Sequence, residues 1–112
     1  MTTDHSFQCD VEKLAEKDKY GNPVTMVRCR GRLVNDTAGE VKDVVKPLIA
    51  AGGRTVIDLA DVNHMDSSGL GALVGLKASA MKQGLCVLEF ANMTPRVLEL
   101  LRLTNLTQMF TS

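Results

Sequence analysis

Residues 62–71 read VNHMDSSGLG, and this stretch decides how the rest of the chain is interpreted. Before it, residues 54–60 form a short apolar run that is typical of a buried central strand. After it, apolar residues recur at helical spacing from a start near Ser67 or Ser68. Strands that alternate with helices predict an α/β sheet, and such sheets place functional groups between the end of a strand and the start of the next helix. The stretch therefore predicts both the fold class and the place of the functional site.

Two adjacent hydroxyls, those of Ser67 and Ser68, are expected at the start of this helix. Free backbone N–H groups and the helix dipole favour an anion there, including a phosphate carried by a serine. A simpler interpretation is that one serine caps the helix, while Gly69 and Gly71 allow close packing. Residue chemistry alone leaves both interpretations open.

The N-terminal part of the chain carries the pattern of a β-hairpin. Apolar and polar residues alternate in 7–11 and again in 24–30, which predicts two half-buried strands. Residues 20–23, YGNP, have the composition of a tight turn. We therefore expect an antiparallel hairpin with a long solvated tip that includes the charged residues 12–19.

Two helices are expected on either side of the central strand. Residues 37–40, TAGE, match a capping box, in which the Thr37 hydroxyl accepts a backbone hydrogen bond and Glu40 reaches back. The first helix should end at Gly52-Gly53, with its last turns kinked by Pro47. Its inner stripe should comprise Ala38, Val41, Val44, Val45, Leu48 and Ile49. The second helix should run to Gln83, with an inner face of Leu70, Leu73, Val74, Ala80 and Met81.

The remaining elements complete an α/β order. Residues 85–90 predict another buried strand, Thr94-Pro95 predicts the start of a third helix, and Met109-Phe110 a short final edge strand. The order is β-β-α-β-α-β-α-β. It predicts a mixed, mostly parallel sheet opened by the N-terminal hairpin, with helices packed on it. We expect one domain over residues 1–112.

Composition excludes several classes of function. Thirteen basic residues balance thirteen acidic ones, so no net field attracts nucleic acid or an anionic membrane. No apolar run is long enough to cross a bilayer, and the N-terminal residues do not form a secretory signal. The three cysteines lack CxxC spacing, which argues against a zinc site. We expect a reduced, cytoplasmic protein with no metal, no cofactor, no nucleic-acid partner and no direct membrane insertion.

Ser67, His64 and Asp66 supply the residue types of a hydrolytic triad. They are nearly consecutive, however, whereas a triad base must fold back onto the serine with an acid behind it. A Gly-x-Ser-x-Gly elbow is also absent, because Met65 stands two residues before Ser67. The chain is therefore not expected to be an enzyme.

Asp58-Leu59 followed by residues 65–71, MDSSGLG, resembles the signature of STAS domains, and specifically of bacterial anti-sigma-factor antagonists. Gly31-Arg32-Leu33 followed by Thr37 is similar to the G-x-L-D-x-x-T pattern that leads into the first helix of that family. Residues 94–97, TPRV, resemble the S/T-P-x-V start of its last helix. The resemblance covers nearly the whole chain and implies the STAS fold.

The resemblance also implies a phosphorylation switch. In the family, the unphosphorylated antagonist binds an anti-sigma factor with GHKL-type serine kinase activity and so frees the sigma factor for transcription. Phosphorylation releases the antagonist, and a PP2C-type phosphatase resets the cycle. By position the phosphorylated residue is Ser67, with Ser68 as the fallback acceptor and Asp66 placing the hydroxyl. The implied partner-binding residues are Asp66, Ser67, Ser68, Gly69, Leu70, Asp36 and Thr37.

One position departs from the family pattern. Members often carry an acid directly after Gly-x-Leu, where this chain has Val34, with Asp36 two residues on as a possible substitute. The alternative function is a STAS scaffold module, in a stress-signalling complex or docked on the ATPase of a lipid transporter. Such a module would use the second helix as its contact surface, with or without phosphorylation.

Overall fold

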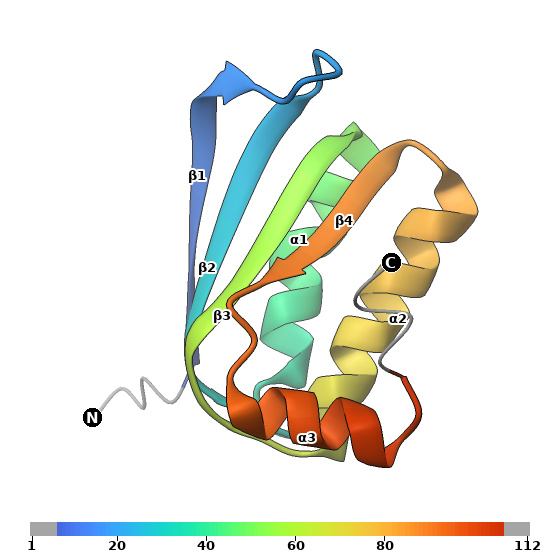
Figure 1. The fold of residues 1–112 in the computed structure, drawn as a ribbon. Helices are drawn as coiled ribbons and strands as arrows, with labels where there is room; N and C mark the ends of the chain where they lie inside the picture. The colour runs from blue at the N-terminus through green and yellow to red at the C-terminus, as the bar shows by residue number, and fades with distance from the viewer. Residues whose placement is uncertain (1–6, 107–112) are drawn as a thin grey trace.

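A four-stranded sheet with two helices on one face makes up most of the computed structural model, which describes residues 7–106 (Figure 1). The elements are β1 (Phe7–Lys17), β2 (Pro23–Leu33), α1 (Ala38–Ala51), β3 (Gly53–Met65), α2 (Ser67–Gln83), β4 (Cys86–Ala91) and α3 (Pro95–Leu103). Helices α1 and α2 lie side by side against the sheet, and α3 crosses the end of the molecule where α2 begins (Figure 1). No helix of the described part has the length and apolar character needed to cross a membrane.

The strands are ordered β1-β2-β3-β4, with β1 antiparallel to β2 and the other neighbours parallel. This confirms the predicted mixed, mostly parallel sheet opened by a hairpin. The two parallel connections run through α1 and α2, as crossover helices do in α/β sheets. The strand expected at Met109-Phe110 lies outside the described residues.

The hairpin has a shorter tip than the charge pattern predicts. Strand β1 continues to Lys17, so most of residues 12–19 belongs to a strand and the prediction of a long tip was wrong. Cross-strand ion pairs explain the difference, because the Arg28 guanidinium lies 2.6 Å from the Glu12 carboxylate on the exposed face of the sheet. Charged residues that pair across two strands lack the apolar alternation by which a single strand is recognised.

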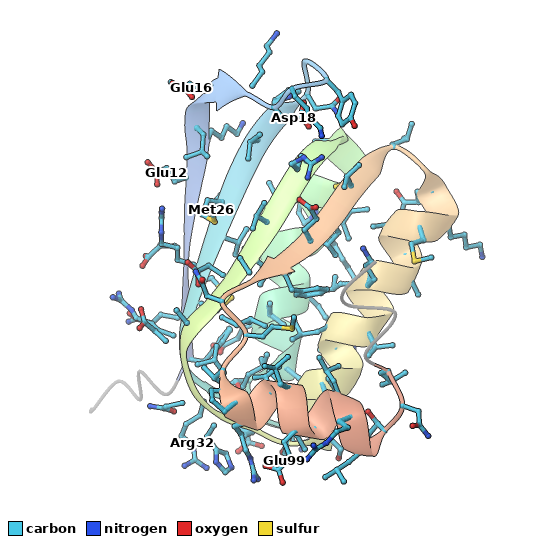
Figure 2. All side chains as sticks on the ribbon, in the orientation of Figure 1. Glu12, Glu16, Asp18, Met26, Arg32 and Glu99 are labelled. Atoms are coloured by element: carbon cyan, nitrogen blue, oxygen red, sulfur yellow. The ribbon has the colours of Figure 1, made fainter. Side chains whose placement is uncertain are left out.

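Asp18 organises the turn that joins β1 to β2. Its carboxylate accepts hydrogen bonds from the backbone N–H groups of Tyr20 and Asn22, at 2.9 and 2.8 Å. Arg54 Nε, on β3, donates to the same carboxylate at 2.8 Å, and the Arg54 guanidinium also pairs with Glu89 on β4. Arg54 therefore ties the turn to two neighbouring strands. Asp18, in this turn, lies at the opposite end of the molecule from Arg32 (Figure 2).

Strand β3 is also longer than predicted, covering Gly53–Met65 instead of 54–60. The register between β2 and β3 shifts twice, and each shift inserts an extra β3 residue. As a result the buried residues Leu59, Val62 and Met65 recur every third position. A search for two-residue alternation misses such a strand, so residues 62–65, which lie beyond the predicted strand, are the end of β3.

The helices bury the stripes that close the core. In α1, Ala38, Val41, Val45 and Ile49 are buried as predicted, and the helix continues through Pro47 until Gly52, at φ 83°, ends it. In α2, Leu70, Leu73 and Ala80 are buried, whereas Met81 is 64% exposed and its assignment to the core was wrong. Met81 lies in the last turn of α2, which ends at Gln83, and the apolar spacing alone does not show where the covered part of the helix stops.

The carboxylate of Asp18 should make the stability of the protein depend on acid. Its hydrogen bond with Arg54, supported by those from Asn22 and Tyr20, lowers the pKa of Asp18 to about 2. A depressed pKa contributes stability above the ordinary carboxyl range, and that contribution is lost as pH falls toward 2. We expect Asp18→Asn to have a lower free energy of unfolding than the wild type at pH 6. The difference in free energy between the two proteins should become smaller as pH falls. Urea unfolding between pH 2 and 6 measures both effects, and an equal difference at every pH would contradict the assignment.

Candidate functional site

Asp66 joins the start of α2 to the loop that precedes α1. Its Oδ1 atom accepts from the backbone N–H of Gly69 at 2.9 Å and caps α2, while Oδ2 accepts from the backbone N–H of Asn35 at 3.1 Å. These hydrogen bonds, that from Gly69 foremost, lower the pKa of the Asp66 carboxyl below its usual value. The ionised carboxylate thus holds two separate segments of backbone together.

The two serines occupy the first two positions of α2. Because Asp66 is the N-cap, the interpretation of a serine as the cap was wrong. Ser67 is exposed, and its hydroxyl makes no hydrogen bond to any residue from 7 to 106. Ser68 is half-buried as a residue, and its hydroxyl donates to Asn35 Oδ1 at 3.3 Å. The two hydroxyls therefore differ in availability, and Ser67 is the more accessible one.

Gly69 brings the backbone of α2 against the end of β2. A Cβ atom at this position would lie 2.1 Å from the carbonyl oxygen of Leu33, which no side chain tolerates. Close packing at Gly69 was expected and is what the structure has, whereas a Cβ at Gly71 would meet nothing within 4 Å. Leu70, next along the helix, is 3% exposed and belongs to the core.

Thr37 closes the loop between β2 and α1 in a way that the capping-box prediction got wrong. Its hydroxyl does not bond the helix; it accepts from the backbone N–H of Val34 at 2.9 Å and donates to the carbonyl of Arg32 at 2.7 Å. The physical reason is that backbone groups of the preceding turn lie closer to this hydroxyl than the first turn of the helix. Thr37 is buried, and the turn presents Asn35 and Asp36 to solvent.

The structure thus brings most of the predicted partner-binding residues to one place. We call Asn35, Asp36, Asp66, Ser67 and Ser68 the serine surface, since they lie on the two adjoining segments at the start of α1 and α2. Gly69, Leu70 and Thr37 are buried beneath it and shape it instead of presenting side chains. The sequence did not predict Asn35 as part of the site. Asparagine is common in loops, and the contacts of Asn35 with Asp66 and Ser68 form only when segments about thirty residues apart come together.

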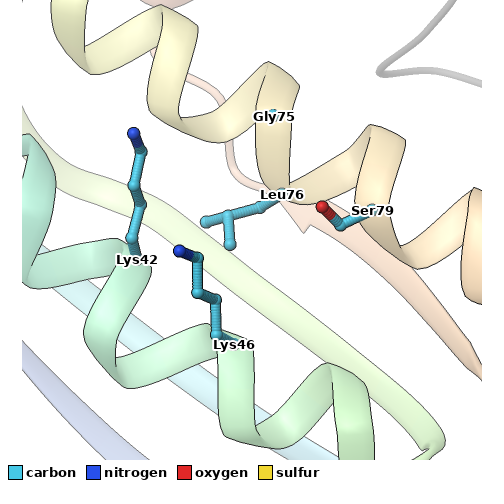
Figure 3. A pocket seen from close by; sticks show the side chains of 5 residues that line it. All are labelled: Lys42, Lys46, Gly75, Leu76 and Ser79. Atoms are coloured by element: carbon cyan, nitrogen blue, oxygen red, sulfur yellow. The ribbon is translucent and has the colours of Figure 1, made fainter.

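Helix α2 exposes an unusual face beside the serine surface. Its sequence, SSGLGALVGLKASAMKQ, contains no acidic residue, and Gly71 and Gly75 are exposed with open space above them. Between this face and α1 lies a groove of about 210 Å³, lined by Lys42, Lys46, Gly75, Leu76 and Ser79. Figure 3 shows both lysine side chains extending from α1 into this groove, with Leu76 beside them.

The chemistry of this region suits contact and charge recognition. Within residues 7–106, no three His, Cys, Asp or Glu side chains come together to hold a metal ion. His64 lies at the end of β3 and acts on Asp66 electrostatically, helping to lower the pKa of that carboxyl. Asp66 itself is engaged by backbone N–H groups, so these residues form a capped helix start with an exposed hydroxyl.

Comparison with known proteins places this geometry in context. The family described as "Mlab, STAS domain" matches residues 19–111. The anti-sigma-B factor antagonist of Bacillus subtilis (strain 168) is 34% identical over 80 residues, which are 71% of this chain and 72% of that protein.

Solved structures share the fold at lower identity. An anti-sigma factor antagonist from Mycobacterium paratuberculosis aligns with a TM-score of 0.73 at 22% identity, covering 99% of this chain and 88% of that one. The phosphorylated form of the Bacillus cell fate determinant SpoIIAA aligns with a TM-score of 0.63 at 16% identity, covering 94% and 88%. These two likenesses extend the match in fold along nearly the whole chain.

Two glycines two residues apart provide a matched test of the helix start. Gly69→Ala forces the Cβ against Leu33 and should lower the free energy of unfolding by about 1–3 kcal/mol, as overpacking does. Gly71→Ala meets no atom and should leave stability unchanged or raise it by up to ~1 kcal/mol, since alanine favours a helix. Urea denaturation of both variants measures the difference, and equal stabilities would contradict the close contact at Gly69.

Proposed function

Because the chain belongs to the STAS-domain family, among the anti-sigma-factor antagonists, we propose that it controls sigma-factor-dependent transcription by binding an anti-sigma factor. In this proposal the partner is a GHKL-type serine kinase, which the unphosphorylated chain binds and which releases it by phosphorylating Ser67. A PP2C-type phosphatase restores the binding form. The chain itself catalyses nothing, and the cycle runs in the cytoplasm.

The exposed hydroxyl of Ser67 is the observation that carries the proposal. It lies at the first position of α2 with no hydrogen bond to the described residues, whereas Ser68 is half-buried and its hydroxyl is engaged by Asn35. A kinase must bring the acceptor hydroxyl into line with the γ-phosphoryl group, which favours a side chain that is free to turn. This difference supports Ser67 over Ser68 as the acceptor.

Phosphorylation would place a dianion beside existing negative charge. A phosphate adds about −1.5 to −2 charge, next to the Asp66 carboxylate and near the exposed Asp36. The helix dipole stabilises such a phosphate by only about 0.3–1 kcal/mol. Shifting a complex from nearly all bound to nearly all free requires a change in binding free energy of about 5.5 kcal/mol. Enclosing the dianion in a desolvated interface supplies the larger effect. The switch therefore acts by local repulsion at the interface.

The frame beneath the serine surface supports a switch with little change of fold. The backbone contact at Gly69 and the two hydrogen bonds of Asp66 fix the start of α2 on both sides. A phosphate on Ser67 would project from this fixed frame into solvent or into the partner. The partner, not the core, would then sense the charge.

Asp36 is the better candidate for the acid that the family pattern has directly after Gly-x-Leu. Val34 is half-buried, and its backbone N–H is bound to Thr37, so this position faces the turn. Asp36 is exposed at the tip of the same turn and belongs to the serine surface. A basic group of the partner could reach it beside Ser67.

The exposed face of α2 extends the proposed contact surface. Gly71 and Gly75 allow a partner to approach the helix backbone, and no carboxylate on α2 repels an acidic partner segment. The match to the family described as "Mlab, STAS domain" favours a second candidate function, in which this face docks a larger protein without phosphorylation. In that scaffold role α2 would matter, while the Ser67 hydroxyl would not.

Phosphorylation by a cognate kinase tests the switch directly. The purified chain is incubated with ATP, Mg²⁺ and each anti-sigma kinase encoded in its own genome, and phosphate is mapped by mass spectrometry. We expect one phosphate on Ser67, its loss in Ser67→Ala and its retention in Ser68→Ala. Ser67→Asp should weaken binding to the same kinase by about tenfold or more, because a buried charge disrupts the interface.

Two results would count against the switch. Phosphate on a residue other than Ser67 would contradict the site, and Ser67→Asp binding as tightly as the wild type would contradict ejection by charge. Stable binding of another protein, with no phosphate from any kinase, would favour the scaffold.

A large side chain on the exposed face of α2 should weaken partner binding without lowering the stability of the fold. A Cβ atom at position 75 meets nothing within 4 Å, so the free energy of unfolding of Gly75→Leu should stay constant or rise. Binding of the anti-sigma factor should fall by about tenfold or more, because interface overpacking costs about 1–3 kcal/mol. Ala50→Leu, on an exposed position of α1, is the control and should bind normally. Unchanged affinity of Gly75→Leu in titration calorimetry would remove this face from the interface.

A further inference from the structure

Two of the three cysteines face each other across the N-terminal hairpin. The antiparallel register of β1 and β2 pairs Cys9 directly with Cys29, and their sulfur atoms lie 3.7 Å apart. Both are free thiols. Cys9 is half-buried and Cys29 is 2% exposed, so one thiol faces the solvent side of the pair and the other lies in the core.

The backbone spacing at this pair is compatible with a disulfide. Residues directly opposite in an antiparallel ladder have Cα atoms about 4.5–5.5 Å apart, within the range of about 4.4–6.8 Å that disulfides span. The sulfur atoms must close from 3.7 Å to a bonding distance, which side-chain rotation and a small shift of the edge strand β1 can supply. No rearrangement of the sheet is needed.

The environment gives the two thiols different roles. The sulfur–sulfur contact with Cys29 lowers the pKa of the Cys9 thiol, while the same contact and burial raise the pKa of Cys29. Cys9 is thus the group that reaches the thiolate form and meets a solvent oxidant. Cys29 remains a thiol beside the Cys9 sulfur and is almost fully shielded from solvent.

We propose that Cys9 and Cys29 form a reversible thiol–disulfide couple that is oxidised by hydroperoxides. The Cys9 thiolate attacks one oxygen of hydrogen peroxide, the O–O bond breaks, and Cys9 becomes a sulfenic acid as hydroxide leaves. The Cys29 sulfur then attacks the Cys9 sulfur and forms the S–S bond; its proton and the displaced hydroxide leave as water. The two thiols lose two electrons, and the peroxide takes them up as it is reduced to water.

The consequence of oxidation is a covalent link between the edge strand and the sheet. Glu40, in the first turn of α1, lies close enough to Cys9 to act on it electrostatically. The two cysteines therefore lie near the start of α1. A disulfide here would fix β1 at that point. This couple stands independently of the proposed function, and in a reducing compartment it would form transiently under oxidant.

Cys86 provides the matched control within the same chain. It is buried on β4, at the other edge of the sheet, with its sulfur 3.7 Å from the Thr55 hydroxyl and no thiol partner. Purified reduced protein is treated with a small excess of hydrogen peroxide, and its intact mass and titratable thiols in denaturant are measured. We expect a monomer lighter by two hydrogen atoms, with thiols reduced from three to one, and recovery of all three with dithiothreitol.

Peptide mapping without reduction should then identify a Cys9–Cys29 link. Cys86→Ser should behave as the wild type does, and Cys9→Ser should form no intramolecular disulfide. Retention of all three thiols would overturn the couple. A sulfinic or sulfonic Cys9 beside a free Cys29, or a disulfide that contains Cys86, would overturn it equally. Because these readouts use the wild type and Cys86→Ser, the test holds even if Cys9→Ser folds poorly.

A pH profile tests the assignment of Cys9 as the attacking thiol. The rate at which iodoacetamide alkylates Cys9 should rise with pH through the pKa of that thiol, since the thiolate is the nucleophile. Cys29→Ala removes the contact that lowers the pKa of Cys9 and should move the midpoint of this profile to higher pH. An unmoved midpoint would overturn the roles assigned to the two thiols.

Discussion

The contact between the backbone of α2 at Gly69 and the carbonyl oxygen of Leu33 is the constraint on which the site depends. Because no Cβ fits between them, the first turn of α2 lies directly on the end of β2. At this distance the Asp66 carboxylate can cap the helix with one oxygen and hold Asn35 with the other. Ser67 is then left at the surface, on a helix start that cannot shift without losing these contacts.

The order of elements, the buried stripes of α1 and the start of α2 follow from apolar spacing, because each is a local property of the chain. The ends of β1 and β3 do not. Strand β1 is extended by charged pairs such as Glu12 with Arg28, and β3 by two register shifts that depend on its neighbour. The residues of the motif do lie beside the turn that precedes α1, as their strand-to-helix position suggests. The bonding of Thr37 could not be predicted, because its hydroxyl has several backbone groups within reach and only the closed turn decides which of them it bonds.

The charged groups that hold this small neutral protein together act locally, at the two ends of the sheet. Arg54 joins a turn to two strands at one end of the sheet, whereas the carboxylates of Asp66 and Asp36 gather at the other. A phosphate on Ser67 would meet the second group and not the first. Charge added at the start of α2 would therefore leave unaffected the ion pairs of Arg54, which lie at the other end of the sheet.

The edge strand β1 has a bearing on how the molecule behaves in a crowded cell. An exposed edge offers unpaired backbone groups to any other strand, which is a route to self-assembly. Charged side chains of both signs, Lys13, Glu16 and Lys17 among them, line this edge, and an irregularity in the pairing falls between Lys13 and Lys17. Charges and bulges of this kind make a second strand dock poorly. The hairpin thus carries its own protection against strand-to-strand pairing between copies of this chain, without a covering helix or loop at that edge.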